Sequence, residues 1–125
     1  MNLKLRGQNF WTTLTVVGAG PVWEGTYALT SNCNTNTCCC PKGNIVLTRS
    51  SSTTALNFLS AQFAVTGYCG LTTSISQSTT YPTGYSWSVA YGLATVQFTL
   101  SADSSSISGA IVGTSLCSMT AKKIN

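Results

Sequence analysis

Cysteines are the residues with the most distinctive chemistry in this 125-residue chain, and they are Cys33, Cys38, Cys39, Cys40, Cys69 and Cys117. The even number favours a disulfide framework in a secreted domain, with a metal site or buried free thiols as the alternatives. Structural zinc sites space their cysteines as Cys-x2-Cys or add histidine, and this chain does neither. The sequence therefore predicts disulfides, an extracellular location, and no metal or cofactor.

The three consecutive cysteines at 38–40 limit how the disulfides form. Neighbouring residues in an extended chain point to opposite sides, and residues two apart rarely reach disulfide geometry. We therefore expect each cysteine of this cluster to pair with one of the three isolated cysteines, in an order that stays open. The region 31–43 would then be tied to the middle and to the end of the chain. Long loops closed in this way contribute about 3–4.5 kcal/mol each in the chain-entropy model.

Catalysis is not expected from the remaining side chains. Without histidine there is no Ser-His-Asp or Cys-His arrangement and no ordinary general base near pH 7. Glu24 and Asp103 are the two acids, whereas a glycosidase-like mechanism needs two facing carboxylates. Asp103 lies in a segment typical of a hairpin turn, where aspartate bonds its own backbone. Glu24 is expected at a strand end, paired with a lysine or arginine, so the sequence predicts a non-enzymatic protein.

The composition is poor in charge. Charged residues are 6% of the chain, against about 25% in ordinary soluble domains, and serine and threonine make up about 30%. The net charge of +4 comes from scattered lysines and arginines, whereas nucleic-acid binding needs a concentrated basic patch. No stretch approaches the ~20 apolar residues of a membrane helix. Nucleic acid and a membrane span are therefore excluded from the expected partners.

Period-two alternation of apolar and polar residues predicts β-strands along most of the chain. It is clearest at 10–16, 85–91 and 96–100 and weaker at 24–30, 44–49, 54–59, 62–67, 71–77, 106–112 and 114–121. Turn residues separate these runs, for example at 41–44 and at Gly92. About 8–10 short strands at this spacing predict an all-β fold. Short hairpins and the need to remove sheet edges favour an up-and-down antiparallel β-barrel with a disulfide-tied loop, and a β-sandwich is the alternative.

The chain divides into an N-terminal strand with a hinge, residues 1–20, and a disulfide-stabilised β-barrel domain, residues 21–125. Residues 10–19 loosely resemble a signal peptide, but threonines interrupt the apolar run, so a strand fits better and any signal is expected upstream. An alternating strand at 9–17 before a Gly-Ala-Gly-Pro hinge is typical of a donor strand that completes a neighbouring subunit. An ordinary first strand of its own sheet is the alternative.

From Trp23 onward the chain resembles the calycin group of lipocalins, fatty-acid-binding proteins and avidins. The segment Trp-Glu-Gly-Thr-Tyr at 23–27 is similar to their opening strand, and residues 98–103 followed by 107–109 resemble a hairpin common in such barrels. The Cys-Cys-Cys cluster and the strand before Trp23 depart from the calycin pattern. The lipocalin tryptophan typically pairs with a basic residue near the C-terminal strand, a place that Lys122 or Lys123 could take. The resemblance implies a barrel.

Aromatic residues are the candidates for binding. Alternation places Tyr85, Trp87 and Tyr91 on one face of a strand, and Phe98 approaches them from the next. Inside a barrel they would line a cavity for a small apolar ligand or fill the interior, and outside they would form a patch for sugars or a partner. The sequence predicts a small apolar ligand bound by Trp23 and these four residues. The alternative is an extracellular filament or surface coat, in which copies of the chain assemble by strand addition through residues 9–17.

Overall fold

The computed structural model describes residues 20–51, 57–91, 94–112 and 117–125, which form an all-β fold. The strands are β2 (Gly25–Ser31), β3 (Cys39–Ser51), β4 (Asn57–Gly67), β5 (Ser74–Thr80), β6 (Ser86–Tyr91), β7 (Ala94–Leu100), β8 (Ser106–Ile111) and β9 (Met119–Lys123). The strand expected at 9–17 and the turn expected at Gly92 lie outside the described residues.

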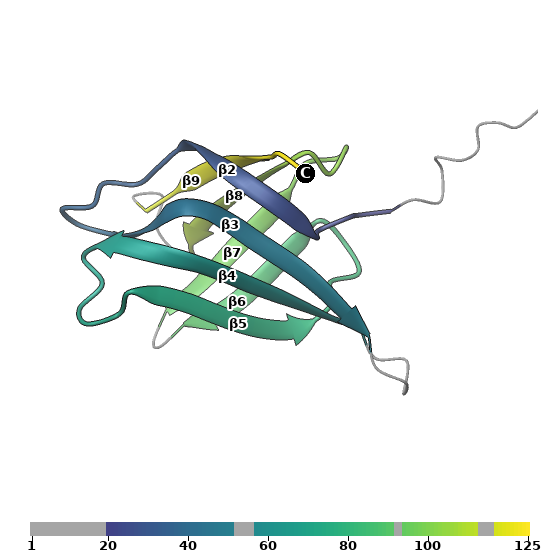
Figure 1. Cartoon of the computed structure of the whole chain (residues 1–125), viewed down its shortest axis with the longest axis horizontal. Coiled ribbons are helices and arrows are strands. Elements are labelled where there is room, and N and C mark those ends of the chain that lie inside the picture. The colour runs from purple at the N-terminus through teal and green to yellow at the C-terminus, as the bar shows by residue number, and fades with distance from the viewer. Residues whose placement is uncertain (1–19, 52–56, 92–93, 113–116) are drawn as a thin grey trace, which may run out of the picture.

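The strands form one antiparallel eight-stranded sheet in the order β5-β4-β3-β2-β9-β8-β7-β6. Each strand pairs with its neighbour along the chain except β5 with β6, and β9 pairs with β2 to bring the sheet around (Figure 1). The predicted up-and-down β-barrel is therefore confirmed in place of the sandwich. Within the described residues no backbone ladder joins β5 to β6, so the barrel is nearly closed, with a seam between them. The Trp87 Nε1 donates a hydrogen bond of 2.6 Å across this seam to the Thr79 Oγ1.

The alternation expected from the sequence decides which side chains fill the barrel. In β4, Leu59, Ala61 and Val65 are buried, whereas Gln62 and Ala64 between them are exposed. Because successive side chains of a strand point to opposite faces, this pattern turns one face of every strand toward the core. Complete burial of a large apolar side chain contributes about 1.5–3 kcal/mol. The core therefore comes from short stretches spread along the described chain.

One expected turn is a bulge instead. The segment 41–44 was expected to separate two strands, but it lies inside β3, which continues from Cys39 to Ser51. Here Lys42 pairs with Ala64 and the next pair is Val46 with Gln62, so β3 carries extra residues. Gly43 has a φ of 77°, a conformation that glycine adopts readily and that β-bulges use. The turn-forming residues therefore bend a strand without ending it.

Three disulfides join the cluster to the isolated cysteines, as expected: Cys33–Cys40, Cys38–Cys117 and Cys39–Cys69. The last two span 79 and 30 residues of sequence. They tie the segment before β3 to the connection after β4 and to the segment that precedes β9. All three lie at one end of the barrel, which we call the disulfide end. No helix among the described residues is long and apolar enough to cross a membrane.

Candidate ligand-binding cavity

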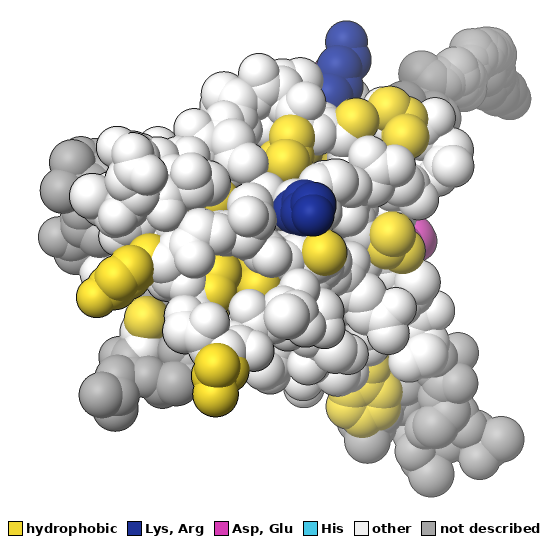
Figure 2. Space-filling view, turned by 60° about the vertical axis from the view of Figure 1, so that its left-hand side comes forward, with side chains coloured by type: hydrophobic (Ala, Val, Ile, Leu, Met, Phe, Trp, Pro, Cys, Tyr) yellow, Lys and Arg dark blue, Asp and Glu magenta, His cyan; other side chains and the backbone are white. Residues whose placement is uncertain are grey.

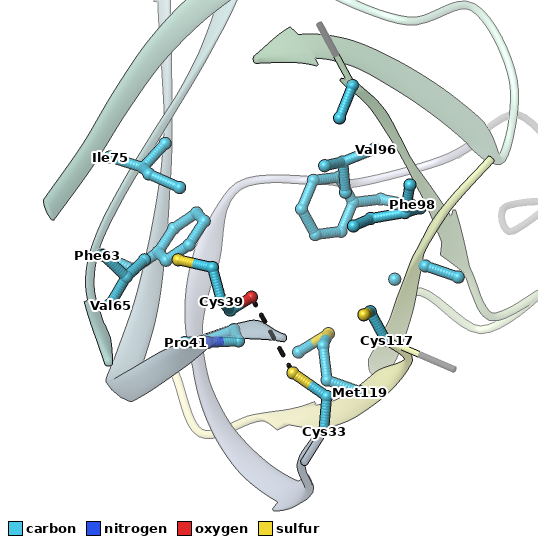
Figure 3. Close-up of a pocket in the computed structure, with 14 residues that line it drawn as sticks. Cys33, Cys39, Pro41, Phe63, Val65, Ile75, Val96, Phe98, Cys117 and Met119 are labelled. Atoms are coloured by element: carbon cyan, nitrogen blue, oxygen red, sulfur yellow. Dashed lines mark hydrogen bonds between the residues drawn. The ribbon is translucent and has the colours of Figure 1, made fainter. Parts of the chain in front are cut away.

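A cavity of about 90 Å³ lies inside the barrel at the disulfide end. Its walls come from both halves of the sheet, with β4 and β5 facing β7, β8 and β9 across it (Figure 3). Its lining residues are Cys33, Cys39, Pro41, Phe63, Val65, Ile75, Ala94, Val96, Phe98, Gly109, Ala110, Ile111, Cys117 and Met119.

The lining is apolar throughout. It contains no charged side chain, hydroxyl or amide, although serine and threonine make up about 30% of the chain. The alternation separates the two kinds of residue: on β5 the half-buried Ile75 points inward between the exposed Ser74 and Ser76. The strands thus place their hydroxyl groups outside and leave an interior without hydrogen-bonding side chains.

A smaller hollow of about 30 Å³ continues the cavity along the seam. The two spaces share Phe63, Ile75, Val96 and Phe98. The smaller one adds Val89 of β6 and Gln77 of β5, whose amide is the one polar side chain that lines it. An apolar molecule in the cavity therefore has room to extend toward the seam.

A column of aromatic rings forms the floor. The ring of Phe98 lines the cavity, and its centroid is 5.6 Å from that of Trp87. The Trp87 ring in turn meets the Trp23 ring edge-on, with 5.9 Å between centroids. Edge-to-face and tilted contacts at these distances stabilise aromatic pairs beyond the burial of their area. The column fills the barrel below the cavity, so the open space is confined to the disulfide end.

The structure brings three of the predicted binding residues together in this column, although only Phe98 lines the cavity. Trp87 and Trp23 are buried beneath it. Tyr85 precedes β6 and is 38% exposed, so it does not continue the inward face of that strand. Tyr91 ends β6, and its side chain lies outside the described residues.

The sequence reasoning missed most of the cavity wall. Phe63, Val65 and Ile75 lie on strands whose alternation was recognised but whose inward residues were not named as candidates. Met119 and the disulfides complete the wall from the opposite side and from the end. A signal was available, because an apolar residue at every second position of 59–65 marks an inward face.

The disulfide end holds the mouth of the cavity in place. The Tyr68 N–H donates a hydrogen bond of 2.9 Å to the Cys38 carbonyl. Gly67 packs so closely here that a Cβ atom would lie 2.5 Å from the same oxygen. At the mouth the Cys33 Sγ is 3.8 Å from the Cys39 carbonyl oxygen (Figure 3), a contact rather than a proton-donating bond because a disulfide sulfur carries no hydrogen. Cross-links and close packing therefore shape the mouth before any ligand arrives.

The opposite end, which we call the closed end, holds the polar contacts. The Trp23 Nε1 donates to the Gly84 carbonyl at 2.9 Å, and the Trp23 backbone N–H donates to the Tyr81 hydroxyl at 3.0 Å. The Tyr81 hydroxyl donates to the Glu24 Oε1 at 2.7 Å. The hydrogen-bond partner of Glu24 is thus a tyrosine instead of the expected lysine or arginine. The Arg49 guanidinium lies over the Tyr81 ring, 4.1 Å from its centroid.

Titratable groups with shifted pKa values gather at the closed end, away from the cavity. Burial, followed by the nearby Glu24 carboxylate, raises the pKa of Tyr27 to about 12. Burial lowers the pKa of Lys123, whose ammonium donates to the Val22 carbonyl at 3.0 Å. Hydrogen bonds from Ser105 and Ser101 lower the pKa of Asp103 to about 2, and one of them is the backbone bond expected in a turn. The cavity lining contains none of these groups.

The described residues offer no group of three histidine, cysteine, aspartate or glutamate side chains that could hold a metal ion. Together with the apolar lining, the geometry is suited to non-covalent binding of an apolar group. No protein-family model matches this chain, and comparisons with curated proteins and with solved structures find no significant match. The calycin resemblance therefore stays a prediction from the two short motifs.

Proposed function

We propose that this protein is a secreted, non-enzymatic β-barrel that binds a small apolar ligand in the cavity at the disulfide end. The observation that carries the proposal is the uniformly apolar lining in a chain rich in hydroxyl groups. An apolar interior adds to stability only where side chains fill it, because an empty space loses the packing contacts of its lining. A ligand would restore those contacts.

The size of the cavity restricts the ligand. Pockets for drug-sized molecules have volumes of about 300–1,000 Å³, and an engineered apolar cavity of about 150 Å³ holds benzene. A cavity of about 90 Å³ therefore fits one small ring or the end of an alkyl chain. The best small ligands gain at most about 1.5 kcal/mol per heavy atom. We expect dissociation constants in the micromolar to millimolar range for such compounds.

The disulfides support the extracellular part of the proposal. Three cross-links are consistent with an oxidising compartment. A charge-poor, hydroxyl-rich surface is also common in extracellular β proteins. The calycin resemblance in the 23–27 segment is a further, independent reason to propose a ligand-binding barrel, although its motifs are short.

A titration followed by methyl NMR tests the ligand. Toluene and straight-chain alcohols of increasing length are added, and chemical shifts are followed at Ile75, Val96 and Met119. We expect saturable shifts at these methyl groups, with affinity rising with chain length until the cavity is full. Methyl groups that do not respond at the solubility limit of every compound would overturn the proposal.

Cavity-filling variants supply the matched control. Ile75→Trp places a larger ring in the cavity, whereas Ser76→Trp places the same ring on the outer face of the same strand. We expect binding to weaken at least tenfold in Ile75→Trp and to be unchanged in Ser76→Trp. Val96→Phe and its outward neighbour Thr95→Phe repeat the comparison on β7 if the first variant does not fold. Equal binding by an inward variant and its control contradicts the proposed site.

A second candidate function is favoured by the seam. The edges of β5 and β6 have no ladder partner among the described residues, and unpaired edges are where strands from other chains add. We propose as the alternative that residues 9–17 pair with such an edge of a neighbouring copy and build an extracellular filament. Light scattering on the full chain and on a chain lacking residues 1–20 decides it. A monomer unchanged by the deletion refutes the filament, and a polymer that the deletion dissolves supports it.

A further inference from the structure

The disulfide end is built from connections without charge. Four connections meet there, at residues 32–38, 68–73, 92–93 and 112–118, and their sequences contain no Asp, Glu, Lys or Arg. The closed end differs, because Glu24, Arg49, Asp103 and Lys123 all lie there. The few charges of the described chain thus lie mostly away from the mouth of the cavity.

Apolar side chains nevertheless project from these uncharged connections. Leu71 is fully exposed and Tyr68 is 76% exposed, both between β4 and β5, and Val112 at the end of β8 is 56% exposed. Figure 2, which turns this end toward the viewer, shows hydrophobic side chains that stand apart from one another among uncharged surface. They form separate projections instead of one flat patch.

The connection that carries Tyr68 and Leu71 is braced. The Cys39–Cys69 disulfide ties it to β3, and the Thr72 N–H donates to the Cys69 carbonyl at 3.1 Å. Exposing a leucine completely on a braced turn forgoes the stabilisation that its burial would bring. Because the turn is tied down at its centre, the two side chains are held outward, close to the mouth at Cys39.

We propose that the disulfide end docks on an electrically neutral lipid surface and that an alkyl chain enters the cavity directly from it. The docking stands on the exposed residues, and the entry of the chain rests on the proposed function. Separate apolar projections suit a soft lipid interface better than a protein partner, whose interface needs a contiguous, closely packed area. An uncharged end also enters the interface without dehydrating ions, and a tyrosine is favoured at the headgroup level. The cavity mouth lies among these projections, so the chain would stay out of water.

Flotation of the ligand-free protein with phosphatidylcholine vesicles tests the docking. We expect binding that is the same at low and high salt and is not increased by anionic lipid, because no charge takes part. The double variant Tyr68→Ser/Leu71→Ser should lower the partition coefficient at least tenfold. Ile124→Ser is the matched control, since Ile124 is also exposed, at 56%, but follows β9 at the closed end. It should leave flotation unchanged.

Other results would overturn the proposal. These are no flotation with neutral vesicles, flotation that needs anionic lipid and is lost in salt, or equal loss in Ile124→Ser. Dimerisation that the double variant abolishes, without any flotation, would assign the projections to a second copy of the chain. The cavity-blocked Ile75→Trp should still float, but it should no longer take up a fluorescently labelled alkyl chain from the vesicles. Failure of uptake with intact flotation thus separates the cavity from the docking surface.

Discussion

The two ends of the barrel are finished in different ways. At the closed end, buried aromatic rings pack on one another and their polar atoms are satisfied by hydrogen bonds, as with Trp23, Tyr27 and Tyr81. At the disulfide end, covalent bonds hold the connections, and no large side chain fills the interior above Phe98. A cavity can persist in a small barrel when cross-links supply the stability that packing does not. The comparison thus assigns stability to both ends and binding to one.

Trp23→Ala should produce the largest effect, at the closed end. It removes a fully buried ring and leaves the Gly84 carbonyl without its donor. We expect the free energy of unfolding to fall by about 3–5 kcal/mol, as for other buried aromatic truncations. Urea unfolding followed by circular dichroism measures it. A loss below about 1 kcal/mol would mean that the closed end is not where packing stabilises the barrel.

Removal of the Cys38–Cys117 disulfide by a paired alanine substitution should have a similar or slightly smaller effect, at the other end. Cross-linking a loop of this length contributes about 3–4 kcal/mol by restricting the unfolded chain. We expect that loss together with weaker ligand binding, because Cys117 lines the cavity. Unfolding and the methyl NMR titration are measured on the same sample. Lost stability with unchanged binding would separate the mouth from the cross-link.

Tyr81→Phe keeps the ring but removes the hydroxyl that bridges the Trp23 N–H and the Glu24 carboxylate. Loss of such a bond to a charged group costs about 1.5–3 kcal/mol. Ligand binding should not change, since Tyr81 does not line the cavity. Tyr85→Phe is the control, because its side chain is partly exposed and lies outside the hydrogen-bonded cluster of the closed end. An equal loss in both variants would contradict the bridging role.

Alkaline pH should weaken the closed end by the smallest amount. The pKa of Tyr27 is raised from 10.0 to about 12 in the folded protein, and that of Tyr81 is also raised, chiefly by burial. Their contribution is complete below pH 10 and is lost as pH rises toward 12, because the unfolded chain releases these protons first. Tyr27→Phe should reduce the slope of the unfolding free energy with pH in this window. An unchanged slope would show that Tyr27 ionises as readily in the folded state.

Part of this site follows from local rules. The pairing of each clustered cysteine with an isolated one was predictable because neighbouring thiols cannot bond without strain. The turn at Asp103 was predictable because an aspartate there bonds its own backbone. The bulge at Gly43 was not, because the same residues that end a strand also bend one. Tyr85 was misplaced for a related reason: alternation holds only within a strand, and β6 begins one residue later.

The sequence alone determined the fold class, the candidate cross-links and the absence of histidine chemistry, since alternation, cysteine spacing and composition are local properties. Which cysteine pairs with which, where the barrel remains unjoined, and where space is left inside depend on strands far apart in the chain. Phe63, Ile75, Val96 and Met119 meet around one cavity only because β9 pairs with β2 and brings the two halves of the sheet together. Such contacts are set by long-range register, which the tertiary structure alone decides.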